Sequence, residues 1–120
     1  MAKILIVDDD ETDRLGLAAL LEQAGYDVCL AAGGDAALEV YCAERIHLVL
    51  TDIVMPGRDG LSLISALRGL DPNASIIAIS GKSRSQLEAS MMFGAAKVLA
   101  KPIDRGTLLA AIDEVMGAST

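Results

Sequence analysis

The sequence predicts an α/β fold: a five-stranded parallel sheet, doubly wound as (βα)5. Short apolar segments alternate with longer segments in which apolar residues recur at helical spacing. This alternation repeats five times without a long linker or a low-complexity tract. Such a pattern is typical of a parallel sheet covered by helices on both faces, with right-handed crossovers. A chain of 120 residues is long enough to bury a core, so we expect one domain over residues 1–120.

The first half of the chain contains three predicted strands and two predicted helices. The segment KILIVD is apolar and β-branched, which predicts a strand buried on both faces. ETDRLGLAALLEQAGY has leucines at helical spacing, with Gly25 as a C-terminal stop. DVCLA predicts a strand, GDAALEVYCAE a helix and HLVLTD a strand. These elements cover residues 3–8, 11–26, 27–31, 34–44 and 47–52.

The second half continues the alternation. LSLISALRGL predicts a helix, SIIAIS a strand, and SQLEASMMF a helix that ends at Gly94. AKVLA predicts a short strand, and a last helix carries Leu108, Ile112 and Val115 on one face. These elements cover residues 61–70, 75–80, 85–93, 96–100 and 104–116.

Composition excludes several classes of protein. The chain is 52% hydrophobic but only 2% aromatic, so its core must be aliphatic. A net charge of -7 argues against unaided binding to nucleic acid or to an anionic membrane. The sequence has no long apolar run and no basic-then-apolar leader, so we expect a soluble, non-exported protein. Cys29 and Cys42 form no CxxC pair, and we expect small buried thiols.

Polar side chains stand where four of the five predicted strands end. The carboxyl ends of parallel strands share one edge of the sheet, where open α/β folds bind their ligands. An Asp there commonly caps the following helix, but four polar ends together favour a functional site. These ends are Asp8-Asp9, Thr51-Asp52, Ser80-Gly81 and Lys101-Pro102.

These groups suit phosphoryl transfer to a carboxylate. Several neighbouring carboxylates require a divalent cation, and oxygen-only ligands favour Mg²⁺. The cation and an ammonium would neutralise a phosphoryl group, while a hydroxyl donates to one of its oxygens. No P-loop or Ser-His pair competes in the sequence, and Gly33-Gly34 lacks the later spacing of G-x-G-x-x-G.

Over essentially its whole length, the chain resembles the receiver domain of two-component response regulators, including chemotaxis receivers. The resemblance rests on the motifs ILIVDDD, GGDAALE, LVLTDIVMPGRDG, IIAISG and KPI, of which the third is the most specific. It implies the flavodoxin-like strand order 2-1-3-4-5, of which chemotaxis receivers are a standard example. This order makes the first and third strands neighbours and brings together Asp8, Asp9 and Asp52.

The resemblance also implies a role for each acid. Asp52 is the phosphoacceptor, whose carboxylate attacks the phosphorus of a phosphohistidine on a partner. Asp9 and Asp52 bind Mg²⁺ directly together with the backbone carbonyl of Val54, and Asp8 acts through a bound water. Mn²⁺ is a possible substitute for Mg²⁺. Asp10 is expected to face solvent or to cap the first helix.

Lys101 and Ser80 complete the implied site. Lys101 pairs with Asp52 at rest and with the phosphoryl group afterwards, and Ser80 moves to donate to a phosphoryl oxygen. The Lys101-Pro102 bond is expected to be cis. Pro56 and Gly60 are expected to shape the loop after Asp52, with Gly60 at a turn position of positive φ.

The chain departs from the family pattern at its signalling positions. Receivers usually have an aromatic residue or His where this chain has Val98, so signal must travel through the 81–86 loop and the fourth helix, or through packing around Val98. Val54 and Lys82 occupy the two positions that tune phosphoryl lifetime. Since Val54 cannot hydrogen-bond an attacking water, we expect slow self-dephosphorylation.

The resemblance implies a regulatory domain in the bacterial cytoplasm that catalyses only its own phosphorylation and dephosphorylation. Its donor is a sensor histidine kinase or a histidine phosphotransfer protein, and its helix 4/strand 5/helix 5 surface changes on phosphorylation. The output partner is unknown, and no direct contact with nucleic acid or membrane is expected. The domain is either free-standing or excised from a longer regulator.

One alternative is enzymatic. The sequence DDDET also satisfies D-x-D-x-T, in which Asp8 and Asp10 would be the nucleophile and general acid. This resembles haloacid-dehalogenase-like phosphohydrolases. However, no acidic pair stands at a strand end after Lys101, and that family leaves TDIVMPGRDG unexplained.

Overall fold

The computed structural model describes residues 2–53, 60–81, 91 and 94–117. Within them, five strands form a single sheet in the order β2-β1-β3-β4-β5, and every neighbouring pair is parallel. The predicted fold class and strand order are therefore confirmed. The strands are β1 (Lys3–Val7), β2 (Asp27–Ala31), β3 (Leu48–Asp52), β4 (Ile76–Ser80) and β5 (Lys97–Ala100).

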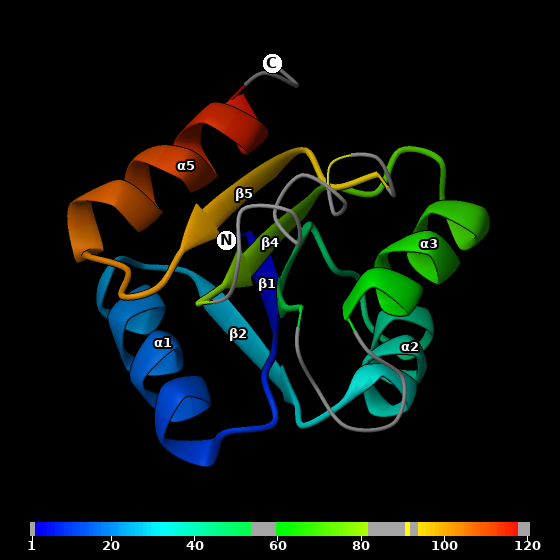
Figure 1. The fold of residues 1–120 in the computed structure, drawn as a ribbon, viewed down its shortest axis with the longest axis horizontal. Coiled ribbons are helices and arrows are strands. Elements are labelled where there is room, and N and C mark those ends of the chain that lie inside the picture. The colour runs from blue at the N-terminus through cyan, green and yellow to red at the C-terminus, as the bar shows by residue number, and fades with distance from the viewer. Residues whose placement is uncertain (1, 54–59, 82–90, 92–93, 118–120) are drawn as a thin grey trace.

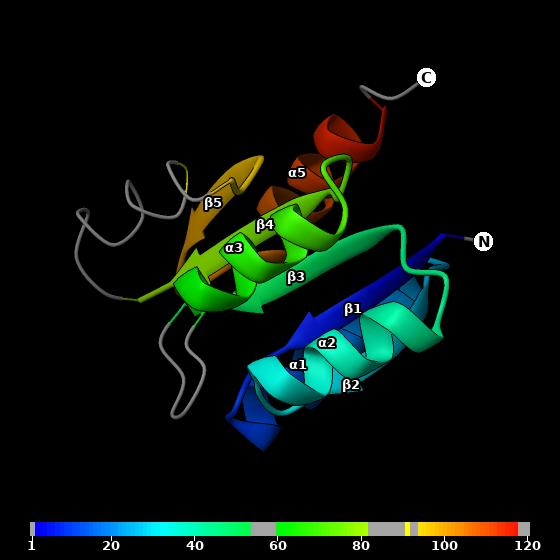
Figure 2. The ribbon, with the colours of Figure 1, turned by 90° about the vertical axis from the view of Figure 1, so that its right-hand side faces the viewer.

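Helices cover both faces of this sheet, α1 and α5 on one face and α2 and α3 on the other (Figure 1, and from the side in Figure 2). None of the described helices is long and apolar enough to cross a membrane. The helix predicted over 85–93 lies outside the described residues apart from Met91. The described helices are α1 (Glu11–Gln23), α2 (Gly34–Ala43), α3 (Gly60–Leu70) and α5 (Arg105–Gly117).

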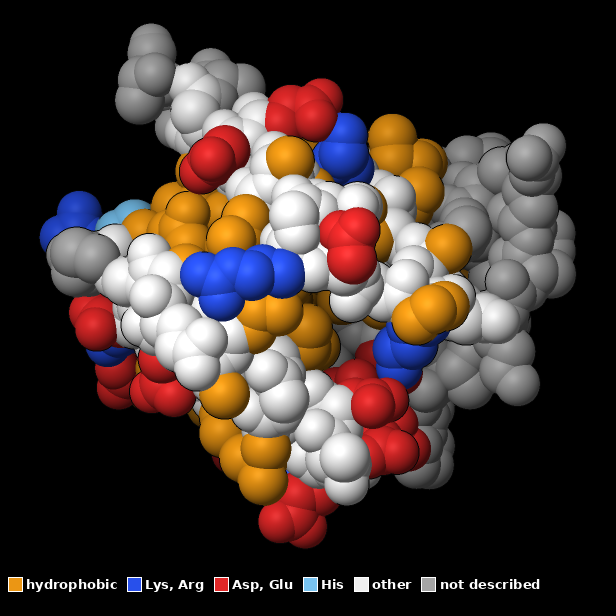
Figure 3. Space-filling view, turned by 90° about the vertical axis from the view of Figure 1, so that its left-hand side faces the viewer, with side chains coloured by type: hydrophobic (Ala, Val, Ile, Leu, Met, Phe, Trp, Pro, Cys, Tyr) orange, Lys and Arg blue, Asp and Glu red, His pale blue; other side chains and the backbone are white. Residues whose placement is uncertain are grey.

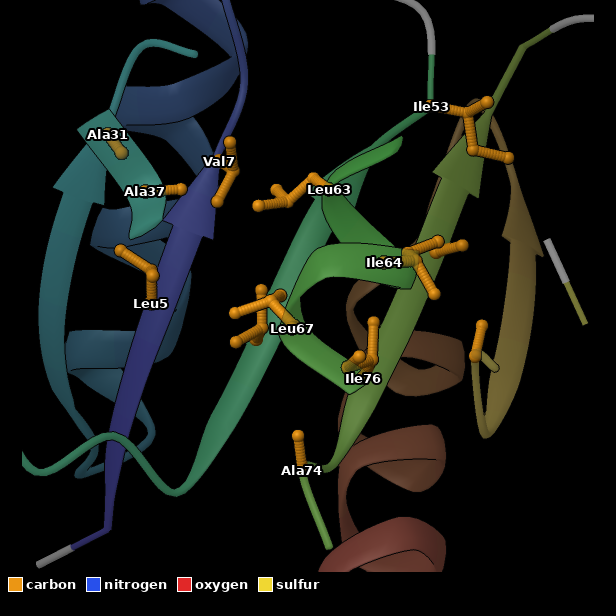
Figure 4. Close-up of a cluster of buried hydrophobic side chains, with 13 residues drawn as sticks. Leu5, Val7, Ala31, Ala37, Ile53, Leu63, Ile64, Leu67, Ala74 and Ile76 are labelled. Atoms are coloured by element: carbon orange, nitrogen blue, oxygen red, sulfur yellow. The ribbon is translucent and has the colours of Figure 1, made fainter. Parts of the chain in front are cut away.

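The core consists of two aliphatic layers, one on each face of the sheet. Side chains alternate along a strand, so Leu5 and Val7 of β1 join the layer under α2 and α3 (Figure 4). Ile4 and Ile6 join the layer under α1 and α5. All four side chains are at most 1% exposed, which confirms the prediction of a first strand buried on both faces.

The ends of α1 follow from local chemistry. Asp10 is its N-cap, and one carboxylate oxygen accepts from the backbone N–H groups of Thr12 and Asp13 at 2.9 and 3.2 Å. This confirms the expectation that Asp10 caps the first helix. After the helix, Gly25 has a φ of 97°, a left-handed conformation that suits glycine.

Two expectations about single residues are wrong. Gly60 begins α3 and is not among the described glycines with positive φ, which are Gly25 and Gly94. Glycine is needed there because a Cβ would collide with the carbonyl oxygen of Asp52 and the Cα of Ile53. Cys42 is exposed rather than buried because it lies on the outer side of α2, whereas Cys29 is half-buried.

Candidate functional site: an acidic cluster with a lysine at the carboxyl edge of the sheet

The pairing of β1 with β3 brings the two key acids together. Val7 lies opposite Thr51 in the parallel register, so the next residues are Asp8, just after β1, and Asp52, the last residue of β3. Both are buried: Asp8 is 2% exposed and Asp52 is 8% exposed. The loop that contains Asp9 then turns toward solvent.

Asp8, Asp9 and Asp52 form a group that could hold a metal ion. Each offers one carboxylate oxygen, and these oxygens lie within 4.8 Å of one another. Carboxylate oxygens are the ligands that Mg²⁺ prefers, and Asp9 leaves the group open to solvent. The residues present therefore fit a magnesium ion, as the strand ends predicted.

Two hydrogen bonds hold Asp8 in the cluster. Its Oδ1 accepts from the backbone N–H of Asp10 at 2.9 Å, and its carbonyl oxygen accepts from Nη1 of Arg14 at 2.7 Å. Burial raises the pKa of the Asp8 carboxyl; the hydrogen bond from Asp10 and the charge of Lys101 oppose this shift without cancelling it. The charged form of the Asp8 carboxylate is thus disfavoured in the folded protein, and a bound cation would stabilise it.

Lys101 lies among the acids. Its Nζ is 3.1 Å from Oδ2 of Asp52 and 3.5 Å from Oδ2 of Asp8. Burial alone would lower the pKa of Lys101, but the hydrogen bond and charge of Asp52, together with Asp8 and Asp13, outweigh burial and raise it. Lys101 therefore stays protonated beside the Asp52 carboxylate. The family resemblance implies this pair for the resting state.

Ser80 ends β4 and is fully buried. Its carbonyl oxygen accepts from the backbone N–H of Lys101 at 3.0 Å, so the backbones of the two residues are joined directly. The Lys101-Pro102 peptide bond is cis, as predicted. Ser80, Lys101 and the acids thus stand on adjacent strands at one edge of the sheet.

Of the three predicted signalling positions, only Val98 is among the described residues. Val98 is half-buried in β5, lies opposite Ala78 and packs against the layer under α2 and α3. Val54 and Lys82 lie outside the described residues, so the expectation about phosphoryl lifetime stays a prediction.

Sequence reasoning missed two residues that contact this cluster. Oδ2 of Asp13 lies 3.3 Å from Nζ of Lys101, and Arg14 donates to the Asp8 carbonyl oxygen at 2.7 Å. Both are in the first turns of α1, where an acidic residue ordinarily complements the helix dipole. Nothing in their sequence pattern distinguishes them from ordinary surface residues of a helix.

The phosphohydrolase alternative receives no support from the geometry. It needs Asp10 as general acid beside Asp8, but Oδ1 of Asp10 accepts two backbone hydrogen bonds at the start of α1. The acids near Lys101 are instead Asp8, Asp13 and Asp52.

This strand order, with an acid cluster and a lysine at the carboxyl edge, defines a signalling receiver that takes phosphate on a carboxylate. Comparison with known proteins agrees. The family model described as "Response regulator receiver domain" matches residues 4–113. The chain is 37% identical over 121 residues to "Probable chemotaxis protein CheY" of Rhizobium etli, covering 97% of this chain and 93% of that protein.

Solved structures show the same likeness. Chemotaxis protein CheY4 of Vibrio cholerae superposes with a TM-score of 0.90 at 30% identity, covering 96% of this chain and 98% of that one. Response regulator protein TrrA of Thermotoga maritima, in complex with Mg(2+)-BeF, gives a TM-score of 0.89 at 29% identity over 96% and 99%. The chain belongs to the response regulator receiver family, and it is a two-component phosphoacceptor domain.

Proposed function

We propose that Asp52 is the residue that accepts the phosphoryl group, and that the donor is a phosphohistidine of a sensor histidine kinase or a histidine phosphotransfer protein. A carboxylate oxygen of Asp52 forms a bond to phosphorus while the phosphorus–nitrogen bond breaks, and the imidazole leaves with the electron pair. The observation that carries this proposal is the position of Asp52: its side chain is 10% exposed, 3.1 Å from the Lys101 ammonium, and within the acid cluster.

Asp8, Asp9 and Asp52 would hold Mg²⁺, or Mn²⁺ as a substitute, together with the backbone carbonyl of Val54. When bound, the cation would offset the negative charge that gathers on the phosphoryl oxygens. Support for this assignment comes from the oxygen-only donor set and from the relative that binds Mg(2+)-BeF. Asp8 would act mainly through a water, since its Oδ1 already accepts from the Asp10 backbone.

The Lys101 ammonium would pair with the Asp52 carboxylate at rest and with the phosphoryl oxygens after transfer. Its contact with Asp52 at rest supports this role. The Ser80 hydroxyl would turn to donate to a phosphoryl oxygen and would alter the surface formed by helix 4, β5 and α5. With Val98 in β5, that change would pass through the 81–86 loop and helix 4, or through packing around Val98, rather than through rotation of an aromatic ring.

The protein would then be a regulatory domain that catalyses only its own phosphorylation and dephosphorylation, as one receiver domain over residues 1–120. Its bacterial relatives and acidic charge support work in the bacterial cytoplasm without direct binding to nucleic acid or membrane. The output partner would recognise the helix 4/β5/α5 surface.

Labelling with a small-molecule donor tests the assignment of Asp52. Wild type incubated with Mg²⁺ and radiolabelled acetyl phosphate should take up label, which chelation of the metal should abolish. Asp52→Asn should take up none. The exposed Asp27, at the opposite end of the strands, gives a matched control, and Asp27→Asn should label like wild type.

Reduction of the acyl phosphate with borohydride, followed by peptide mass spectrometry, identifies the modified residue. Modification at position 52 supports the proposal. Label that persists in Asp52→Asn, or that maps to Asp8 as the phosphohydrolase alternative requires, would contradict it.

A further inference from the structure

Lys101 contacts a third acid that the proposed phosphoacceptor chemistry does not use. Asp13, in the first turn of α1, places Oδ2 3.3 Å from Nζ of Lys101, close to the 3.1 Å separation from Asp52. An ammonium has three donors. Among the described residues, the ion-pair partners of Lys101 are Asp8, Asp13 and Asp52, so the lysine is shared by three carboxylates.

Asp13 differs from the other two acids in its exposure. Its side chain is 48% exposed, against 2% for Asp8 and 10% for Asp52. Asp13 and Lys101 both line a groove between α1 and the segment after β5, together with Leu17, Gly81 and Ile103. On the face of α1 and α5, one basic side chain lies directly beside a group of acidic ones (Figure 3). Asp13 therefore contacts Lys101 from the solvent side, and Asp52 contacts it from the buried side.

Helix capping does not account for this contact. The N-cap of α1 is Asp10, whose carboxylate already accepts from the backbone N–H groups of Thr12 and Asp13. The Asp13 carboxylate instead reaches a lysine of a distant segment, after β5.

We propose that Asp13 is a positioning residue that holds Lys101 toward solvent in the resting state and opposes the build-up of phosphoryl charge at Asp52. The inference rests on the proposed role of Asp52. When a phosphoryl group occupies Asp52, its oxygens and the Asp13 carboxylate compete for one ammonium. Like charges that share a cation repel each other at this range, and solvent screens the repulsion only partly. Asp13 thus sets how readily the site is phosphorylated.

Neutralising Asp13 tests this competition. With acetyl phosphate and Mg²⁺, Asp13→Asn should raise the second-order rate constant of phosphorylation roughly three- to tenfold, the range expected for one partly screened charge contact. The affinity for beryllofluoride with Mg²⁺, measured by calorimetry, should rise in the same sense. Both gains should shrink at high salt, because screening weakens the repulsion.

Two further variants distinguish the Asp13–Lys101 contact from the general effect of removing a negative charge from α1. Asp13→Glu keeps the carboxylate and should return both measurements to within about twofold of wild type. Glu11→Gln removes the same charge from the same turn of α1, but Glu11 is not among the ion-pair partners of Lys101 described above. It should also stay within about twofold.

The outcomes distinguish this inference from the proposed function. If wild type is labelled at Asp52 but Asp13→Asn matches Glu11→Gln, or is slower than wild type, the positioning role of Asp13 is refuted while Asp52 remains the acceptor. If Asp52 is not labelled at all, the proposed function is refuted, and with it the inference about Asp13. A rate gain in Asp13→Asn that salt suppresses and Asp13→Glu abolishes supports the inference.

Discussion

Asp8 shows how a single buried carboxylate can be useful and costly at once. It is 2% exposed, and its burial raises its pKa above the ordinary value of 3.8 despite the hydrogen bond from Asp10 and the nearby Lys101. The folded state therefore holds a proton on Asp8 more tightly than the unfolded chain does. The stability due to this preference is complete below pH 3.8 and is lost as the pH rises through the folded-state pKa.

The substitution Asp8→Asn should stabilise the metal-free protein at neutral pH. Asparagine keeps an oxygen for the Asp10 N–H but removes the buried charge, so the free energy of unfolding should rise by about 1–2 kcal/mol at pH 7. The gain should vanish well below pH 4, where wild-type Asp8 is protonated. Urea denaturation with a chelator at both pH values measures this.

The surface variant Asp27→Asn serves as the control and should change stability by no more than about 0.5 kcal/mol at either pH. A gain for Asp8→Asn that is equal at the two pH values would contradict the electrostatic explanation.

At the scale of elements, the start of α3 lies directly against the end of β3. The backbone N–H of Gly60 donates to the Ile53 carbonyl oxygen at 2.7 Å, where α3 begins. A Cβ at Gly60 has no room beside Asp52 and Ile53. The start of the helix therefore helps to fix the backbone at Asp52, the proposed phosphoacceptor.

Gly60→Ala should destabilise the protein by about 2 kcal/mol or more, because backbone rather than a flexible side chain must move. At Gly69, in the same helix, an added Cβ would meet nothing within 4 Å. Gly69→Ala should instead be neutral or stabilising by up to about 1 kcal/mol, since alanine favours helix.

Urea denaturation compares the two alanine variants, and the uptake of label from acetyl phosphate reports on the Asp52 site. Gly60→Ala should also slow labelling, whereas Gly69→Ala should not. Equal stability of the two variants would show that the contact of α3 with β3 is not tight in solution.

For the whole molecule, the parallel sheet gathers acidic charge at one edge of a chain whose net charge is already -7. A cation that binds only the folded state stabilises it by mass action. At a Mg²⁺ concentration ten times the dissociation constant, the free energy of unfolding should rise by about 1.4 kcal/mol.

Asp9→Asn should remove most of this stabilisation while leaving the metal-free stability nearly unchanged, because Asp9 is exposed. Thermal unfolding with and without Mg²⁺, against sodium chloride of equal ionic strength, measures the effect. Equal responses to Mg²⁺ in wild type and Asp9→Asn would show that Asp9 is not part of the proposed metal site.

Much of the fold was predictable because its signals are local and repeated. Each strand is a short apolar run in the sequence, and the observed bounds differ from the predicted ones by at most one residue, as in β3 at Leu48–Asp52. That polar groups share one edge was predictable as well, since parallel strands end at a common edge. The meeting of the acids of β1 and β3 was predicted from the strand order that the family resemblance implies. The exposure of Cys42 and the steric need for Gly60 were not, because each depends on which neighbour packs against that position.

By itself, the sequence determined the alternation of strands and helices, the five parallel strands and the candidates Asp8, Asp9, Asp52, Ser80 and Lys101. Periodicity and strand ends are properties of contiguous residues, so they can be read along the chain. Only the tertiary structure decided that Asp13 shares Lys101 with Asp52 and that Arg14 supports the Asp8 backbone. Those contacts depend on how α1 packs beside the segment after β5, which no local pattern specifies.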